Sequence, residues 1–235
     1  CQRLLMLLKV LSVLTLLLGI NLPTESQEFH WYESLMKDEV TILVRDVPDS
    51  RYQEFRAIVD LEATTAAAVA LLQDTTACPK WVHRCASSEI IETVNSTERF
   101  FHQVTTLPFP AKSRDAVFHG AIYFKHGDEA TITLSSAHER LAAGKHIRII
   151  DTHGYYHIQP LGEGSIRLTW QFYVNPAGSL PAFLINAMVT DLPYRSLIAF
   201  RNLVAEAPYN QASFIYNASG VPIDITFAPR NHGDE

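Results

Sequence analysis

The chain has 235 residues, 47% of them hydrophobic, which suits one domain with an apolar core and a short leader. Its formal net charge is -6, with 19 Lys and Arg residues against 25 Asp and Glu residues. Nucleic-acid binding needs a clustered basic surface, and the chain has no Lys/Arg cluster, so this composition excludes a nucleic-acid partner and disfavours anionic membrane surfaces.

The first residues, 1–26, have the pattern of a secretory signal peptide. The uncharged apolar run at 10–20 is shorter than the ~20 residues that a membrane span needs. Thr24 and Ser26 are small enough for a cleavage site that would leave Gln27 as the new N-terminus. An uncleaved signal anchor is the alternative. We expect an exported protein, periplasmic or secreted, and membrane-anchored if the segment is retained.

Two of the three cysteines lie close together in the segment that follows this leader. Cys1 precedes the apolar run, whereas a lipid-acceptor cysteine would follow it. Cys78 and Cys85 form an even pair in an oxidising compartment, which favours a disulfide between them. Two unreactive core thiols are the alternative.

Hydrophobic periodicity predicts, in chain order, a helix, two strands, two short helices, a longer series of antiparallel strands and a final long helix. Apolar residues at helical spacing predict a short helix over residues 28–37. An Ala-rich helix follows, capped by Thr64 or Thr65, and then a short helical or irregular piece that carries Trp81. Alternation and turn residues predict the strands. The predicted strands are 40–47, 52–61, 89–94, 99–106, 116–125, 130–136, 146–153, 155–161 and 166–174.

The longest predicted element is an amphipathic helix over residues 179–206. Ser179 is a suitable N-cap, and Pro181 is tolerated in the first turn. Pro193 lies deep inside the pattern, where it removes a backbone hydrogen bond and predicts a kink. Helices segregated from an antiparallel series indicate an α+β fold, with this helix packed on one curved sheet. The apolar tail, 207–235, is expected to lie on the surface as an extended strand.

Four motifs, in this order, resemble those of START domains, the StAR-related lipid-transfer family, and the last is similar to bacterial members. The resemblance covers roughly residues 28 to 206. The motifs are Trp81 after the helix pair, the Pro-rich loop 108–115 that ends in Arg114-Asp115, Gly154-Tyr155-Tyr156 leading to Pro160-Leu161, and Asp191-Leu192-Pro193-Tyr194-Arg195-Ser196-Leu197 in the final helix.

This resemblance implies a helix-grip fold, START/Bet v 1-like, for a domain at 27–206 between the leader and a C-terminal extension. A curved antiparallel sheet then wraps the long helix around an internal lipid cavity. The implied function is non-enzymatic binding and transfer of one lipid, a phospholipid, a sterol or another apolar lipid. The implied protein is a monomer that needs no cofactor and touches membranes transiently.

In the family, the Pro-rich loop and the final helix form the gate, and an aromatic residue at the loop tip enters the membrane. Phe109 occupies that position here. The alternative, packing of Phe109 inside the domain, is less favoured because the flanking prolines stiffen the loop. Pro193 is either a weak point at which the first half of the helix tilts or a static kink.

The cavity is expected to be lined by strand and helix residues, with Gln103, Tyr123 or Arg148 as polar groups. A solvent-facing Gln103 is equally compatible with the pattern. Val82 stands where ceramide-transferring members carry an acid, and Gly120 falls at the acid–arginine pair of steroidogenic members, so neither recognition pattern is present. The predicted lining is Trp81, Phe101, Gln103, Phe118, Tyr123, Arg148, Trp170, Phe172, Phe183, Leu184, Ala187 and Met188.

Arg114 and Asp115 are expected to tie the loop to the sheet, since an unpaired buried charge is costly. Catalytic patterns are weak: the chain has no Gly-x-Ser-x-Gly, and His138-Glu139 lacks a second histidine at metalloprotease spacing. His153 and His157 fall in strand-like sequence, so no metal site is predicted. A cyclase or hydratase acting on a hydrophobic substrate is one alternative. A ligand-free interaction module with a filled cavity is another.

Overall fold

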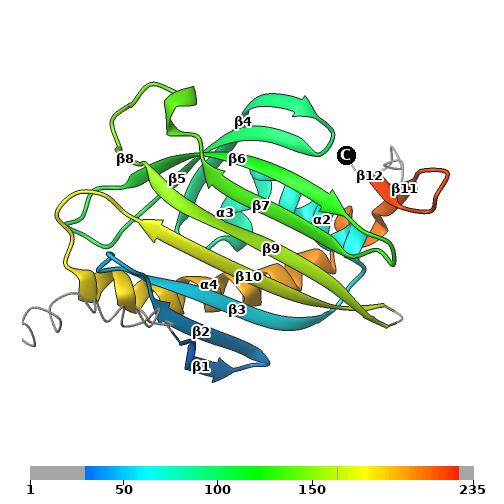
Figure 1. Cartoon of the computed structure of the whole chain (residues 1–235), viewed down its shortest axis with the longest axis horizontal. Helices are drawn as coiled ribbons and strands as arrows, with labels where there is room; N and C mark the ends of the chain where they lie inside the picture. Colours follow the sequence, from blue (N-terminus) through cyan, green and yellow to red (C-terminus); the bar gives the residue numbers. More distant parts are fainter. Residues whose placement is uncertain (1–29, 163, 228–235) are drawn as a thin grey trace, which may run out of the picture.

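The computed structural model describes residues 30–162 and 164–227, so the predicted leader, 1–26, lies outside the described residues. One antiparallel sheet curves around three helices, in the strand order β1-β2-β3-β10-β9-β7-β6-β5-β4, and the short β8 pairs in parallel with β6 (Figure 1). Its strands are β1 Tyr32–Lys37, β2 Val40–Asp46, β3 Gln53–Glu62, β4 Cys85–Asn95, β5 Glu98–Thr105, β6 Arg114–Phe124, β7 Ala130–Ser136, β8 Ile147–Ile149, β9 Asp151–Gly162 and β10 Ser165–Asn175.

The helices lie on one face of this sheet, behind the strands in the view of Figure 1. They are α2 Thr65–Gln73, α3 Cys78–Trp81 and the long α4 Ala182–Val204. Thr64 caps α2, because its hydroxyl oxygen accepts a hydrogen bond from the backbone N–H of Ala67 at 3.1 Å. The predicted α+β helix-grip architecture is confirmed. None of the described helices combines the length and hydropathy that a membrane crossing requires.

The described part of the segment predicted as an opening helix is a strand. Asp38 and Glu39 have positive φ angles of 50° and 62°, and they form a tight two-residue turn between β1 and β2. Tyr32 pairs with Val44 across this hairpin. Backbone pairing with β2 therefore overrides a helical periodicity that spans too few residues to form a stable helix alone.

Gly154 continues a strand where we expected a break. The predicted strands 146–153 and 155–161 are the three-residue β8 and one long β9 that runs through this glycine. A Cβ atom at Gly154 would lie 2.3 Å from both the Gln171 carbonyl oxygen and Phe172 Cδ2. The glycine is needed because the neighbouring strand approaches closely here, and it marks no turn.

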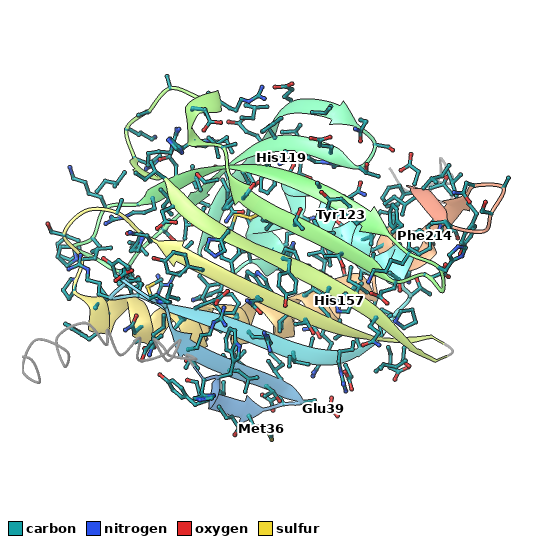
Figure 2. All side chains as sticks on the ribbon, viewed as in Figure 1. Met36, Glu39, His119, Tyr123, His157 and Phe214 are labelled. Carbon is teal, nitrogen blue, oxygen red and sulfur yellow. A yellow bond between two sulfur atoms is a disulfide. The ribbon has the colours of Figure 1, made fainter. Side chains whose placement is uncertain are left out.

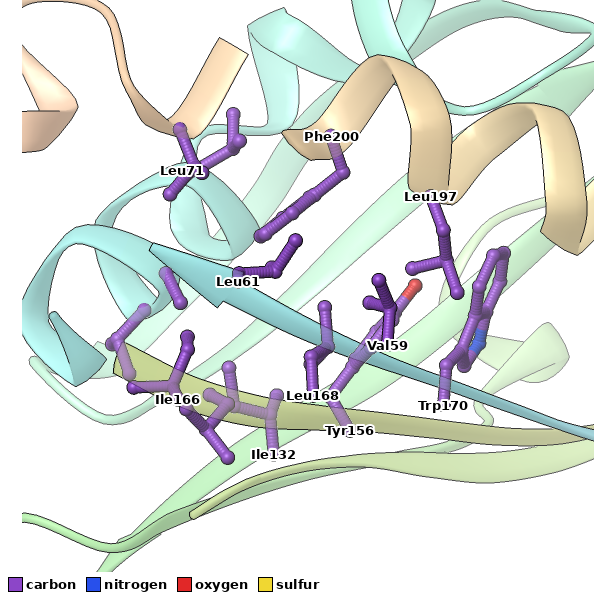
Figure 3. Close-up of a cluster of buried hydrophobic side chains, with 14 of the residues drawn as sticks. Val59, Leu61, Leu71, Ile132, Tyr156, Ile166, Leu168, Trp170, Leu197 and Phe200 are labelled. Atoms are coloured by element: carbon purple, nitrogen blue, oxygen red, sulfur yellow. The ribbon is translucent and has the colours of Figure 1, made fainter. Parts of the chain in front are cut away.

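The core lies between the sheet and the second half of α4. Leu197, Phe200 and Val204 of the helix are fully buried against strand residues that include Leu168 and Trp170 (Figure 3). The tail forms a hairpin, β11 Ser213–Tyr216 and β12 Pro222–Thr226, where we expected a single extended strand.

Replacing Phe200 tests how firmly α4 is anchored. We expect Phe200→Ala to lower the free energy of unfolding by about 3–5 kcal/mol, because it opens a cavity in the core between the sheet and the second half of α4. The matched control on the same helix is Phe183→Ala, whose side chain is 78% exposed; it should change stability by less than about 0.5 kcal/mol. Urea unfolding followed by circular dichroism measures both, and equal losses would contradict this anchoring.

Candidate functional site

Two adjoining hollows lie between the inner face of the sheet and the helices. The α3 hollow, which borders Cys78 and Trp81, has a volume of about 100 Å³, and the α4 hollow, which borders Ile185 and Leu192, has about 140 Å³. They share five lining residues, so they lie side by side along a common wall. The shared residues are Val82, Gln103, Phe118, Trp170 and Phe172.

Alternation along the strands gives this interior its aromatic lining. Phe101 and Phe118 lie 5.2 Å apart between ring centroids, and Phe118 lies 5.9 Å from Phe172. Trp170 stacks on Tyr156 at 5.2 Å and meets Trp81 edge to face at 6.2 Å. Such aromatic contacts hold the rings in defined positions, so the interior wall is preorganised.

Seven of the predicted lining residues border these hollows. Gln103, for which solvent exposure was the alternative, faces the interior and borders both. Their role in lipid binding stays a prediction. The seven are Trp81, Phe101, Gln103, Phe118, Trp170, Phe172 and Met188.

Three predicted lining residues on α4 do not border the hollows. Phe183 is 78% exposed, Ala187 is exposed, and Leu184 borders neither hollow. The buried residues of the second half set the rotation of the helix, and helical spacing then turns other positions inward. Those positions are Ile185, Met188, Val189 and Leu192.

Tyr123 and Arg148 were also expected in the cavity, and both lie on the other face of the sheet. Tyr123 is 58% exposed, on the face turned away from the helices (Figure 2). Its strand turns Phe118 and Ile122 inward, so an odd-numbered neighbour points outward. Arg148 is placed outside in the same way, because Ile149 next to it borders the α4 hollow.

Arg148 belongs to a buried ion-pair cluster around Asp115. Its Nε and Nη2 donate to Asp115 Oδ2 at 3.0 and 2.8 Å, and His102 Nε2 lies 3.0 Å from the same oxygen. Burial raises the pKa of the Asp115 carboxyl, but the hydrogen bonds from Arg148 and His102 outweigh it, so the pKa lies below its ordinary value. The Nη1 of Arg148 donates to the carbonyls of His138 and Leu141 in the connection between β7 and β8. Through the ion pair with Asp115, this connection is tied to β6.

Arg114 fixes the Pro-rich loop in a different way. Its guanidinium donates to the backbone carbonyls of Lys112, Pro176 and Ala177, which joins the loop to the connection between β10 and α4. Each of its three nitrogens thereby donates to a backbone carbonyl, and Arg114 also borders the α4 hollow.

The expected gate elements lie next to one another. Phe109 at the loop tip is 97% exposed. Beside it, Leu107 and Ala111 pack on the small cluster that contains Leu180 and Ile185 at the start of α4. Pro193 is buried within the helix. The loop and the first half of α4 therefore contact each other at one end of the hollows.

A disulfide joins Cys78 to Cys85, with their Cα atoms 6.0 Å apart. It connects α3 to β4 and so holds Trp81 in the wall of the α3 hollow. Among the residues that the structure describes, no cluster of three His, Cys, Asp or Glu side chains is placed to hold a metal ion.

Several polar residues that border the α3 hollow were not predicted from the sequence, among them Gln73 and Arg99. Arg99 is two positions before Phe101 and four before Gln103 on β5, so alternation puts all three on the inner face. That parity was readable in the sequence. Gln73, at the last position of a helix, carries no comparable pattern.

The sequence pattern of the START domain matches residues 17–192. The chain belongs to the START domain family. An uncharacterized Pseudomonas aeruginosa protein is 28% identical over 174 residues, which cover 73% of this chain and 85% of that protein.

Among solved structures, the STAR-related lipid transfer protein from Xanthomonas axonopodis (fragment 25–204) superposes with a TM-score of 0.70 at 26% identity, covering 75% of this chain and 99% of that one. Human STARD10 has the same fold, with a TM-score of 0.66, 20% identity, and coverage of 75% and 74%. This START domain therefore has the general architecture of lipid-binding relatives.

Asp115→Asn tests the buried ion-pair cluster. Because the pKa of Asp115 is lowered in the folded protein, its carboxylate stabilises the fold above about pH 4, and this contribution is lost as the pH falls through the lowered value. The variant leaves Arg148 buried without its charge partner, so we expect a loss of about 3–5 kcal/mol at pH 7.

The variant should also show a flatter decline of stability below about pH 4, where the wild type loses this contribution. Urea unfolding at pH 7 and pH 3 measures both effects. Asp60→Asn is the control, because Asp60 and Arg167 form a half-exposed pair worth at most about 1 kcal/mol. If the two variants lost similar amounts of unfolding free energy, the buried Asp115 cluster would contribute no more to stability than the half-exposed pair does.

Proposed function

We propose that this START domain binds one lipid molecule in the interior formed by the two hollows and transfers it between membranes, as a monomer and without chemistry. The aromatic and aliphatic lining of both hollows carries this proposal, since concave apolar sites with few polar groups are typical ligand sites. The lipid-transfer relative from Xanthomonas axonopodis supports it.

The polar groups of the interior favour binding over catalysis. Asp74 is the one carboxylate among the described residues that border the hollows, and no histidine borders them. Asp74 Oδ1 accepts from the Thr76 and Ala77 backbone, and Oδ2 from the Tyr209 hydroxyl at 2.7 Å. A cyclase or hydratase would need a pair of groups to move protons, and these side chains supply none.

Lipid entry requires the interior to widen, because each hollow is smaller than the roughly 300–1,000 Å³ of common small-molecule sites. In this proposal the first half of α4 moves, because it is less firmly buried than the second half. Its inward residues are mostly half-buried, whereas Leu197, Phe200 and Val204 in the second half are fully buried. Pro193 lies between these halves and leaves one backbone carbonyl without its helical donor, so in this proposal it is the hinge.

The same end of the molecule supplies the membrane contact. Phe109 and Phe183 are the two most exposed large apolar side chains of the described residues, one on the loop and one on the first half of α4. Insertion of these rings into a bilayer would hold the gate at the lipid surface. The disulfide supports an exported location, because disulfides persist in oxidising compartments.

Native mass spectrometry of the purified protein, followed by uptake of fluorescent lipids, tests the binding function. We expect a co-purified lipid in a one-to-one complex, or saturable uptake after delipidation. If the protein carries no lipid and takes none up, the ligand-free interaction module becomes the better description.

Phe109→Ser tests the membrane contact. Removing the ring takes away roughly 1.5–3 kcal/mol of apolar burial, so the rate of lipid transfer between vesicles should fall about tenfold or more. Lipid affinity in solution should be unchanged, because Phe109 borders neither hollow. Tyr123→Ser, which removes an exposed ring from the opposite face, is the control and should transfer lipid at the wild-type rate. A wild-type transfer rate in Phe109→Ser would refute the contact.

A further inference from the structure

The α3 hollow ends in a polar corner that the lipid-binding proposal does not itself explain. The inner face of β5 presents Arg99, Phe101 and Gln103 in a row, with Arg99 farthest from the α4 hollow. Gln73, at the end of α2, lies across from Arg99 and borders the same hollow.

Arg99 is held by neutral acceptors alone. Its Nη2 donates to Gln73 Oε1 at 2.8 Å and to the Ser96 carbonyl at 3.1 Å, and its Nη1 donates to the Gln73 carbonyl at 3.3 Å. No carboxylate of the described residues lies within 4.0 Å of the guanidinium. Burial lowers the pKa of Arg99 from its ordinary value, and the charge of Asp224 opposes part of this shift. A half-buried cation whose direct contacts are all neutral attracts an anion.

Two residues that border the α3 hollow carry a buried donor without an acceptor among the described residues. The Nε2 of Gln73 is buried and has no partner among the described residues, although its Oε1 is engaged by Arg99. The Nε1 of Trp170 is also buried without a partner. Each unsatisfied buried donor costs about 1–3 kcal/mol, which an acceptor on a ligand would recover.

The one acid in this corner does not fill the need for an anion. Asp74 borders the α3 hollow, but both of its carboxylate oxygens are already engaged by η1 (Thr75–Ala77) and by Tyr209. Burial raises the pKa of the Asp74 carboxyl, but hydrogen bonds from Thr76, Tyr209 and the backbone together outweigh it, so the pKa lies below its ordinary value and the ionised carboxylate is engaged by those donors.

We propose that the α3 hollow binds the anionic headgroup of an amphiphilic lipid, a carboxylate or a phosphate, with Arg99 and Gln73 as donors. The apolar chain then occupies the α4 hollow, among Ile185, Val189 and Leu192. A guanidinium matches both oxyanions, because its forked N–H groups donate to two oxygens at once. This inference rests on the proposed lipid-binding function and specifies the class of lipid.

Three probes with the same sixteen-carbon chain separate the headgroup from the tail: palmitate, hexadecyl phosphate and hexadecanol. Binding to the full chain at pH 8 can be followed by quenching of the tryptophans, since Trp81 and Trp170 border the α3 hollow. We expect one or both anions to bind the wild type at least about tenfold more tightly than the alcohol. The anion that binds more tightly shows whether the preferred headgroup is a carboxylate or a phosphate.

Arg99→Gln should reduce this preference to nearly one and leave the affinity for hexadecanol unchanged. Arg99→Lys should retain part of the preference, since lysine keeps the positive charge but lacks the paired N–H groups that donate to two oxygens at once. Arg167→Gln, which removes an exposed arginine elsewhere on the sheet, is the control and should keep the preference.

The outcomes distinguish the two proposals. Equal affinity of the wild type for all three probes would overturn the headgroup site and leave lipid binding intact, and this comparison needs no variant to fold. An unchanged preference in a folded Arg99→Gln would also overturn the site. Failure of the wild type to bind any of the probes saturably would count against the lipid-binding function itself.

Discussion

The interior of this START domain depends on the anchoring of the second half of α4. Phe200 is fully buried and meets the Trp81 ring edge to face, with centroids 5.1 Å apart. Trp81 is in turn held by the disulfide that joins α3 to β4. This rigid contact sets the rotation of the whole helix. The first half, which lacks such an anchor, turns Ile185 inward and Phe183 outward as a consequence.

Much of the fold was readable from the sequence, because the strands alternate cleanly and the family motifs occur in order. The errors arose where periodicity is not selective. Residues 28–37 fit a helix, but pairing with β2 stabilises a strand. On α4, apolar residues cover more of the circumference than the buried face, so Phe183 and Ala187 look as suitable as Ile185. Contacts between residues distant in sequence, such as that of Phe200 with Trp81, determine which face of α4 is buried.

Placement of the site residues depended mainly on strand parity. Phe118 was placed correctly, and Tyr123, five residues later on the same strand, faces outward as that odd separation requires. Arg99 shares its parity with Phe101 and was overlooked, although the alternation was visible. Predicting the rotation of a helix about its axis requires knowledge of its long-range contacts. Which residues of a strand share a face can be predicted by counting positions along it. Partners across the sheet, such as Arg148 for Asp115, could not be found by counting.

Three arginines illustrate how a cation that is partly or fully buried is compensated. Arg148 has a carboxylate partner, whereas Arg114 and Arg99 both have neutral acceptors only: three backbone carbonyls for Arg114, and Gln73 and Ser96 for Arg99 at the end of the interior away from α4. The unsatisfied Gln73 borders the α3 hollow, whereas most of the side chains that border the α4 hollow, next to the gate, are apolar. In the proposed arrangement a lipid enters head first, and its tail lies next to Phe109 and the bilayer. Release then begins with apolar groups that lose little on leaving, while Arg99 holds the headgroup until the last step.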